Sequence, residues 1–248
     1  MDRVALVTGA NTGIGWAIAQ RLVQDGYPLA FHTRDEDKES REAYETIAKD
    51  GRAEWLTGDL AEDGAGERLV DATVEKLGRI DVLVNNAGLT SAKPTLELTA
   101  ADFDRIFSVD VKGSFLLSAA AAKAMQRQGS GGAIVNITSV HEHIARPGFT
   151  FYAGAKAALG MISRSMALEL AGDGIRVNSV APGVIATPRN EADAGALSPE
   201  VPLGRPGRPQ EVAALVSWLA GDEASYVTGA SYIVDGGMVQ QVVSTPAW

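Results

Sequence analysis

Tyr152 and Lys156 have the side-chain types and the spacing that proton transfer at an alcohol oxygen requires. They lie four residues apart in a segment with helical periodicity, so both side chains should lie on one face of a helix. A phenol with an ordinary pKa of ~10 is a poor acid–base catalyst near pH 7. Lowering that pKa by about three units takes roughly 4 kcal/mol of preferential stabilisation of the phenolate, which a fixed ammonium group nearby can supply.

Ser139 is a third candidate for the same chemistry. It precedes Tyr152 by 13 residues and ends a predicted strand, so a loop separates the two residues. Its hydroxyl could hold the substrate oxygen while Tyr152 moves the proton. Taken alone, a tyrosine four residues before a lysine more often marks an exposed helix face, so this interpretation depends on the rest of the sequence.

A glycine-rich turn follows the first predicted strand. Residues 8–15 read Thr-Gly-Ala-Asn-Thr-Gly-Ile-Gly and lead directly into a predicted helix. Glycines there allow a tight turn and a close approach of the backbone to a pyrophosphate, while the N-terminus of the helix attracts the phosphate charge. Such a turn is often only a turn, but its place between the first strand and the first helix favours dinucleotide binding. The predicted contacts are Gly9, Asn11, Thr12, Gly13, Ile14 and Gly15.

Two further strand ends carry residues that could complete such a site. Asp59, followed by Leu60, comes after the third predicted strand and could accept a hydrogen bond from an adenine amino group, or could instead cap a helix. Asn86, Ala87 and Gly88 follow the fourth predicted strand, where they could satisfy backbone groups around a ligand. The same residues also form good turns, so both interpretations stay open.

The elements that must position these residues alternate regularly between strand and helix. Short β-branched runs, typical of strands buried on both faces, occur at 4–8, 29–33, 53–57, 81–85, 133–138, 176–180 and 231–234. Helical stretches occur between them at 13–25, 36–49, 65–77, 101–128, 151–171 and 209–220. This alternation predicts an α/β fold with a doubly wound parallel sheet, the Rossmann fold, as a single domain over residues 1–248 with helices on both faces.

The segment 181–209 interrupts the alternation. It contains six prolines, so it cannot form a long regular helix. It leaves a predicted strand at the end where ligands bind in open α/β sheets. We therefore expect a substrate lid, with a plain surface loop as the alternative.

Composition limits the partners and the environment of the protein. The chain has 22 Lys and Arg against 31 Asp and Glu, a net charge of −9, which argues against nucleic acid or an anionic membrane surface as the main partner. Zero cysteines exclude a disulfide framework and Cys-ligated metals, and three histidines leave little for another metal site. No apolar run approaches the ~20 residues of a spanning helix, and residues 4–10 are too short for a signal peptide. We expect a cytoplasmic protein with no metal.

Motifs in a consistent order extend over nearly the whole chain. They are Thr8–Gly15, Asn85–Gly88, Ser139 with Tyr152–Lys156, Arg176–Asn178, Pro182–Gly183 and Asp235–Gly237. Together they resemble the short-chain dehydrogenase/reductase family. The resemblance implies hydride transfer between NAD or NADP and a secondary alcohol or ketone. It also implies that the tyrosine is the acid–base, that the lysine orients the nicotinamide ribose and lowers the pKa of the phenol, and that the serine polarises the carbonyl.

Asp110 departs from the family pattern, which usually has an asparagine that helps to hold a water between the lysine and a proton relay. An ionised aspartate accepts hydrogen bonds but cannot donate them. Asp110 could pair with Lys156 and weaken its effect on Tyr152, or could simply be tolerated. The remaining cofactor contacts implied by the resemblance are at Tyr152, Lys156, Pro182, Gly183, Ile185 and Thr187.

Local similarities indicate a branch of the family. Those that resemble the glucose 1-dehydrogenase branch are Ser139–Glu142, Thr187–Asn190, Ala224–Gly229 and Asp235–Met238. In that case His141 and Glu142 could meet sugar hydroxyls, although charged loop residues are often merely solvated.

Two alternatives differ in substrate or in class. A 3-oxoacyl-carrier-protein reductase, or another ketone reductase, is the nearest enzyme; the carrier-protein group commonly has an arginine in the segment where this chain has the uncharged Leu168. A non-catalytic dinucleotide sensor on the same fold would not need Ser139, Tyr152 and Lys156 in register.

The second predicted strand indicates a cofactor preference. It ends with an uncharged Thr33 where NAD-preferring members of the family usually have an acidic residue, and Arg34 follows. Arg34 could pair with a 2′-phosphate, so we expect NADP to be preferred over NAD, although the acidic residues 35–37 could neutralise it.

The resemblance also implies a homotetramer. The small side chains of residues 118–122 would permit close approach of helices from two subunits, and the apolar tail 239–248 would favour burial. Ordinary packing within one subunit is the alternative.

Overall fold

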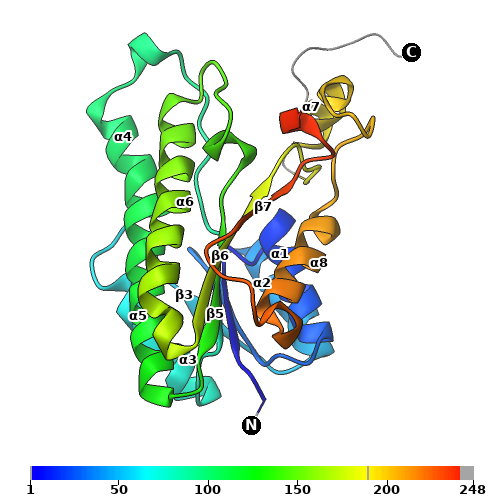
Figure 1. The fold of residues 1–248 in the computed structure, drawn as a ribbon. Coiled ribbons are helices and arrows are strands. Elements are labelled where there is room, and N and C mark those ends of the chain that lie inside the picture. Colours follow the sequence, from blue (N-terminus) through cyan, green and yellow to red (C-terminus); the bar gives the residue numbers. More distant parts are fainter. Residues whose placement is uncertain (1, 189, 241–248) are drawn as a thin grey trace.

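A seven-stranded parallel sheet forms the centre of the computed structural model, which describes residues 2–188 and 190–240. The strands are β1 (Ala5–Thr8), β2 (Leu29–Thr33), β3 (Ala53–Thr57), β4 (Val82–Asn85), β5 (Gly132–Ile137), β6 (Ile175–Pro182) and β7 (Ser231–Val234). Their order is β3-β2-β1-β4-β5-β6-β7, so the chain reverses its direction of travel across the sheet between β1 and β4. Figure 1 shows the strands of this sheet between two groups of helices. The predicted doubly wound parallel sheet is confirmed.

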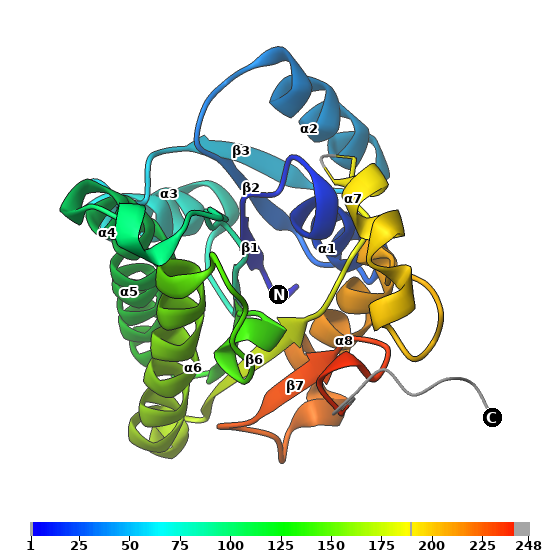
Figure 2. The ribbon, with the colours of Figure 1, turned by 90° about the horizontal axis from the view of Figure 1, so that it is seen from above.

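Helices cover both faces of this sheet, as predicted (Figure 2). One face carries α1 (Gly13–Gln24), α2 (Lys38–Asp50) and α8 (Pro209–Ala220). The other carries α3 (Ala65–Leu77), α5 (Ser114–Gln128) and α6 (Thr150–Leu170). Among the described residues, no helix is both long enough and apolar enough to cross a lipid bilayer.

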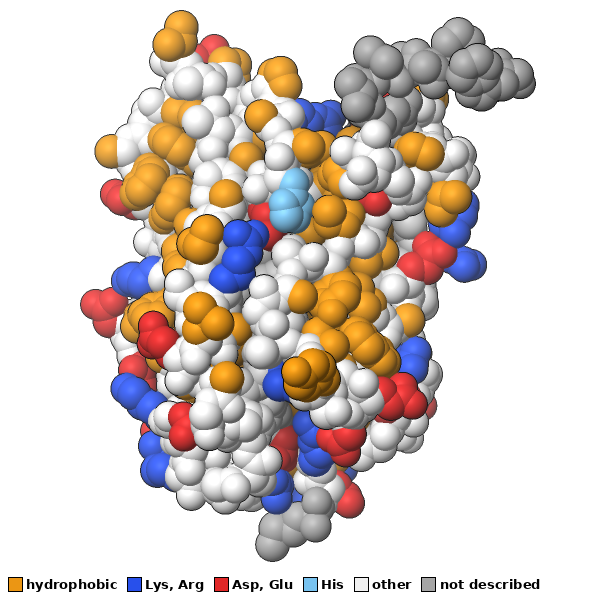
Figure 3. Space-filling view, viewed as in Figure 1, with side chains coloured by type: hydrophobic (Ala, Val, Ile, Leu, Met, Phe, Trp, Pro, Cys, Tyr) orange, Lys and Arg blue, Asp and Glu red, His pale blue; other side chains and the backbone are white. Residues whose placement is uncertain are grey.

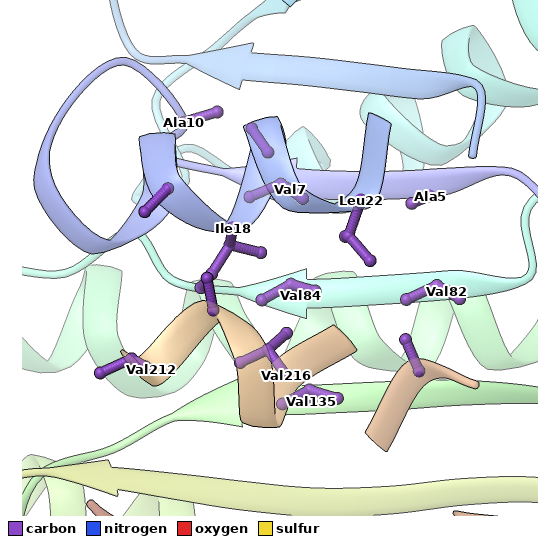
Figure 4. Close-up of a cluster of buried hydrophobic side chains, with 14 of the residues drawn as sticks. Ala5, Val7, Ala10, Ile18, Leu22, Val82, Val84, Val135, Val212 and Val216 are labelled. Atoms are coloured by element: carbon purple, nitrogen blue, oxygen red, sulfur yellow. The ribbon is translucent and has the colours of Figure 1, made fainter. Parts of the chain in front are cut away.

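Successive strand residues contribute to two buried apolar clusters, one on each face. In β1, Val7 packs with α1 and α8, whereas Leu6 packs with α3 and α5. Figure 4 shows the first cluster, in which Ile18 of α1 and Val216 of α8 meet over the strands. In β1 and β4 every residue is buried and most are apolar, which is why the sequence places these strands within one residue; the outer strands β3 and β7 are only partly buried.

The predicted helix 101–128 is divided in the structure. α4 (Ala100–Phe107) is followed by a π-helical turn at Ser108–Gly113, and α5 begins at Ser114. A π turn adds a residue to the helical repeat and frequently occurs at functional sites. This one contains Asp110, which is fully buried.

The segment 181–209 contains only short helices, α7 (Glu191–Ala196) and a single 3₁₀ turn at Ser198–Glu200. β6 extends to Pro182, two residues past the predicted end, because Pro182 still lies opposite Val234 of β7. An isolated bridge between Ile185 and Gly207 then joins the two ends of the segment. The prolines therefore have the predicted effect of preventing a long helix.

Candidate active site

A cleft of about 700 Å³ opens at the carboxyl ends of β1 to β4. The residues predicted from sequence that line it are Gly9, Asn11, Thr12, Gly13, Ile14, Gly15, Arg34, Asp59, Leu60, Asn86, Ala87, Gly88 and Thr187. Those predicted but not lining it are Asp110, Ser139, Tyr152, Lys156, Pro182, Gly183 and Ile185. The glycine turn and the ends of β2, β3 and β4 thus share one concave surface.

The glycine turn passes close to the end of β4. Gly9 and Gly13 have φ values of +61° and +57°, which L side chains rarely adopt. A Cβ added at Gly9 would lie 3.1 Å from Ala87 Cα. Thr12, the residue before α1, makes no side-chain cap, so the first amide groups of the helix remain open to an anion at the cleft.

Asn86 fixes the turn to β4. Its Nδ2 donates to the carbonyl oxygens of Thr8 and Gly9 at 3.0 and 3.1 Å. Thr8 Oγ1 in turn accepts from the backbone N–H groups of Asn86 and Ala87, both at 3.0 Å. The amide side chain therefore satisfies backbone groups where the sheet opens, which leaves the neighbouring wall rigid.

His32 lies at the β2 end of the cleft, and the sequence analysis missed it. It is buried, its Nε2 is 3.0 Å from Gly58 O, and its Nδ1 has no partner among the described residues. Burial lowers the pKa of His32 to about 4, so the ring is neutral at physiological pH. A polar residue inside an otherwise apolar strand was the available signal.

Asp59 also lines the cleft, and its Oδ1 accepts a hydrogen bond from Ala61 N at 2.9 Å. This contact closes a turn over residues 59–61; α3 begins at Ala65 with Gly64 as its N-cap residue, so Asp59 does not cap that helix. The other carboxylate oxygen of Asp59 is not used in this contact. The hydrogen bond to an adenine amino group stays a prediction.

Arg34 stands at the rim of the cleft. Its Nε is 2.7 Å from Asp35 Oδ2, and both side chains are exposed. The hydrogen bond with Asp35 raises the pKa of the Arg34 guanidinium. Thr33 is buried, donates to Asp35 O at 2.9 Å and accepts from Trp55 Nε1 at 2.9 Å.

Tyr152 and Lys156 both lie in the N-terminal part of α6. Lys156 is buried, its Nζ donates to Ile137 O at 3.3 Å, and it lies 5.6 Å from the centroid of the Tyr152 ring. The predicted shared helix face is therefore real, and the ammonium group is fixed beneath the end of β5.

Ser139 begins the 3₁₀ turn Val140–Glu142, called η3, directly after β5. Its Oγ accepts a hydrogen bond from His141 N at 3.2 Å, so the hydroxyl hydrogen is left to donate elsewhere. The His141 ring stands edge-on to Tyr152 with 6.1 Å between centroids, and Phe149 stands edge-on to Tyr152 at 5.8 Å. The turn after Ser139 thus packs against the proposed acid–base.

Asp110 pairs with Lys156. Its Oδ1 accepts from Leu89 N at 2.7 Å, and its Oδ2 is 3.0 Å from Lys156 Nζ. Gly88 makes this possible, because a Cβ there would lie 2.9 Å from Asp110 Oδ2. Burial acts to lower the pKa of Lys156, but the Asp110 carboxylate and then Tyr152 outweigh it, so that the pKa is raised. Of the two possibilities considered for Asp110, the structure contains the pair with Lys156.

Glu142 does not face the space beside Tyr152. Its side chain is 1% exposed and its Oε1 accepts from Arg164 Nη2 at 3.0 Å. The expectation that Glu142 meets sugar hydroxyls is therefore wrong for this structure.

The predicted contacts on 181–209 lie at its start. Gly183 packs against β7, since an added Cβ would be 2.7 Å from Asp235 Cβ. Ile185 is buried in the apolar cluster of α1 and α8. Thr187 alone reaches the cleft, where a Cβ added at Gly13 would lie 3.2 Å from its Cγ2.

No group of three or more His, Cys, Asp or Glu in residues 2–188 and 190–240 is placed to hold a metal ion.

Comparisons with known proteins agree on one family. A family model described as "Enoyl-(Acyl carrier protein) reductase" matches residues 9–239. The "Uncharacterized oxidoreductase YohF" of Escherichia coli K12 is 43% identical over 244 residues, covering 96% of each chain. "Glucose 1-dehydrogenase 2" of Bacillus subtilis is 36% identical over 243 residues, covering 95% of this chain and 94% of the relative. The crystal structure of acetoin dehydrogenase from Enterobacter cloacae superposes with a TM-score of 0.91 at 43% identity, covering 100% and 98%.

Proposed function

This chain belongs to the short-chain dehydrogenase/reductase family, and we propose that it transfers a hydride between a nicotinamide cofactor and a small ketone or secondary alcohol. The observation that carries the proposal is Lys156, buried and fixed beside Tyr152 on α6, with Ser139 at the end of the neighbouring strand. The proposed substrate class is that of α-hydroxy ketones such as acetoin and the vicinal diols or diketones related to them.

The cleft suits a dinucleotide. Side chains at Gly9 and Gly13 would be strained and would crowd Ala87 and Thr187, so the turn offers bare backbone to a pyrophosphate. The open N-terminus of α1 favours the phosphate charge. When bound, the nicotinamide supplies or accepts the hydride.

The residues of the chain supply the proton chemistry. Ser139 donates its hydroxyl hydrogen to the substrate oxygen, since its Oγ is already an acceptor for His141 N. Tyr152 gives its phenolic proton to that oxygen in reduction and takes it back in oxidation. Lys156, kept charged by Asp110, stabilises the phenolate that remains.

The surroundings of Tyr152 favour a small substrate over a sugar. The rings of His141 and Phe149 stand against it, and burial lowers the pKa of His141, so this wall is largely neutral. Glu142, the one nearby carboxylate that could bind sugar hydroxyls, is turned into α6. The 43% identity to a protein named acetoin dehydrogenase, against 36% to one named glucose 1-dehydrogenase, supports the same choice.

The test is the absorbance of reduced nicotinamide with a panel of acetoin, diacetyl, 2-butanone, glucose and an acyl-carrier-protein ketone, each with both cofactors. We expect the highest kcat/KM with acetoin or diacetyl. Higher kcat/KM with glucose would move the protein to the glucose 1-dehydrogenase class, and preference for the acyl carrier would make it a carrier-protein reductase. Cofactor binding with no turnover of any ketone would make it a dinucleotide sensor and overturn the proposal.

NADP is the proposed preferred cofactor. Arg34 lines the cleft with an exposed side chain, and the buried Thr33 at the end of β2 is uncharged, although Asp35 and Asp37 line the same cleft. The Arg34 guanidinium can exchange its exposed contact with Asp35 for a doubly charged 2′-phosphate, which is the stronger partner.

The segment 181–209 is the proposed substrate lid of a single domain. Thr187 already reaches the cleft opposite Gly13, and the segment leaves β6 at the ligand-binding end of the sheet. The zero cysteines of the chain and the use of a nicotinamide cofactor support a cytoplasmic location.

A homotetramer is proposed on different residues from those first considered. Ser118 and residues 120–122 are buried within the subunit, so they are not available to a partner; residues 241–248 of the tail lie outside the described residues. Figure 3 instead shows apolar side chains gathered over α4 and α6 and again over β7. The exposed apolar residues on these elements include Phe103, Met161, Leu168 and Ile233.

Two separate patches match the two kinds of interface that a closed D₂ tetramer needs. Light scattering should give about four times the subunit mass of 25.9 kDa. A monomer would overturn this assignment, and a dimer would mean that only one patch is covered.

A further inference from the structure

The carboxylate of Glu142 is buried three residues after Ser139, and the proton chemistry proposed above does not use it. Its side chain is 1% exposed. Oε1 accepts from Arg164 Nη2 at 3.0 Å and lies 3.5 Å from His143 Nε2, while Oε2 has no partner in the described part of the chain. A buried carboxylate held by an arginine is costly unless its place is well defined.

The face of α6 that receives this carboxylate is the face that carries Tyr152 and Lys156. Tyr152, Lys156, Gly160 and Arg164 follow one another at intervals of four residues, so they form one stripe along the helix. A Cβ at Gly160 would lie 2.7 Å from Glu142 Oε1. The missing side chain at Gly160 therefore leaves room for the Glu142 carboxylate, a position we call the Glu142 seat. Arg164, one turn later, holds the carboxylate there.

The turn η3 transmits this contact to Ser139. Glu142 N donates to Ser139 O at 2.8 Å, and His141 N donates to Ser139 Oγ at 3.2 Å. A displacement of the Glu142 carboxylate from α6 would therefore shift both hydrogen bonds that orient the serine hydroxyl relative to Tyr152.

We propose that Glu142 is a positioning residue: seated on Gly160 and held by Arg164, it sets the place of the Ser139 hydroxyl against Tyr152. The inference rests on the proposed oxidoreductase function. Misplacement of a reacting group by about 1 Å can cost up to ~100-fold in rate, so a small movement of η3 would be felt in kcat.

The first test is Glu142→Gln, which keeps the size of the side chain and removes its charge. We expect kcat for the best ketone substrate to fall about 10-fold or more. The Kd of reduced cofactor, measured by fluorescence titration, should stay within about 2-fold, because neither Ser139 nor any residue of η3 lines the cleft.

The matched control for loss of a buried ion pair is Asp81→Asn. Asp81 is 4% exposed and paired with Arg79, at the amino end of the sheet. We expect a fall in Tm similar to that of Glu142→Gln, with kcat at the wild-type level. Equal kcat for wild type and Glu142→Gln at a lowered Tm would overturn the inference, because the pair would then be structural only.

Gly160→Ala tests the same contact between Glu142 and α6 without changing a charge. It also tests the positioning role if Glu142→Gln fails to fold. The new Cβ must displace the carboxylate, so kcat should fall although alanine favours a helix more than glycine. Gly154→Ala on the same helix is the control, since its Cβ would meet only Phe107 Cζ at 3.8 Å. Unchanged kcat in Gly160→Ala contradicts the inference, whereas a wild-type enzyme with no turnover at all contradicts the proposed function itself.

Discussion

Two buried carboxylates, one beyond each end of β4, meet a cation in different ways. At the amino end, Asp81 uses both oxygens: Oδ2 accepts from Val4 N and Arg79 Nε at 2.8 and 2.7 Å, and Oδ1 accepts from Arg79 Nη2. At the carboxyl end, Asp110 Oδ1 accepts from Leu89 N at 2.7 Å, and Oδ2 makes a single contact with the cation, at 3.0 Å from Lys156 Nζ.

This difference indicates that the Asp81 pair contributes mainly to stability and the Asp110 pair mainly to function. A carboxylate bonded by two nitrogens of one guanidinium, as Asp81 is, forms a stronger and more specific pair than one that meets an ammonium through a single oxygen, as Asp110 does. Lys156 shares its charge between Asp110, Ile137 O and the Tyr152 ring. We interpret the pair of Asp81 with Arg79 as a contribution to the stability of the fold. The pair of Asp110 with Lys156 instead keeps the buried lysine charged beside Tyr152.

The largest expected effect is at the carboxyl end. Tyr152→Phe removes only the oxygen that transfers the proton, so turnover should be lost by a factor of ~100 to 10,000. Cofactor affinity and Tm should remain near wild type, because the ring and its contacts with His141 and Phe149 are kept. Residual activity above about 1% of wild type would remove Tyr152 from the role of acid–base.

The next largest effect is expected at the amino end of β4, where we expect a loss of stability rather than of turnover. Asp81→Asn leaves Arg79 without its buried partner, which should cost about 3 kcal/mol of the free energy of unfolding. For a chain of this length that corresponds to a fall in Tm of roughly 6–12 °C, measured by calorimetry, with kcat unaffected. A variant that kept its Tm and lost activity would reverse the comparison.

The fold could be predicted from the sequence because its signals are local. Buried strands such as β1 and β4 are short, mainly apolar runs, and the glycine turn that follows β1 is read directly from residue types. The candidate site was predicted as far as motifs extend: the lining of the cleft by Gly9 to Gly15 and by Asn86 to Gly88 was expected.

What could not be predicted depends on packing between distant segments. The π turn around Asp110 adds one residue without breaking the apolar periodicity, so 101–128 reads as a single helix. The direction of Glu142 is set by Arg164, 22 residues later, and by the bare backbone of Gly160. His32 belongs to no motif: the sequence marks it only as a polar residue in an apolar strand, and its burial beside the cleft comes from the fold.

A smaller effect is expected at the rim of the cleft, far from either buried pair. Arg34→Ala should lower the ratio of kcat/KM for NADPH over NADH by about 10-fold, since charge-assisted bonds to a phosphate contribute on the order of 1.5–3 kcal/mol and Asp35 competes for part of this. Arg68→Ala, an exposed arginine paired with Glu62 and outside the cleft lining, is the control. An unchanged ratio in Arg34→Ala would make dual specificity the better account.

The smallest effect is expected for Asp110→Asn. This variant tests the comparison most directly, because it leaves Ser139, Tyr152 and Lys156 in place. In the wild type, burial acts to lower the pKa of Lys156, and the Asp110 carboxylate together with Tyr152 outweighs it. Asp110→Asn removes that carboxylate, so the pKa of Lys156 should fall and its ammonium should lose the proton at a lower pH. The high-pH limb of kcat/KM should therefore move to lower pH, while the rate near pH 7 changes by less than about 10-fold, the equivalent of one pKa unit or 1.36 kcal/mol.

Asp104→Asn is the control for this last variant. Asp104 is exposed and lines the cleft, whereas Asp110 is buried outside the cleft lining, so the same change of charge at Asp104 should leave the limb in place. A limb that moves equally in both variants would reflect the general field of the cleft rather than the pair. A limb that stays fixed in Asp110→Asn would show that Lys156 needs no carboxylate to remain charged. A shift confined to Asp110→Asn would mean that the Asp110 carboxylate, through its single contact with the lysine, acts on the protonation of Lys156, whereas Asp81, bonded twice to Arg79 at the other end of β4, acts on Tm.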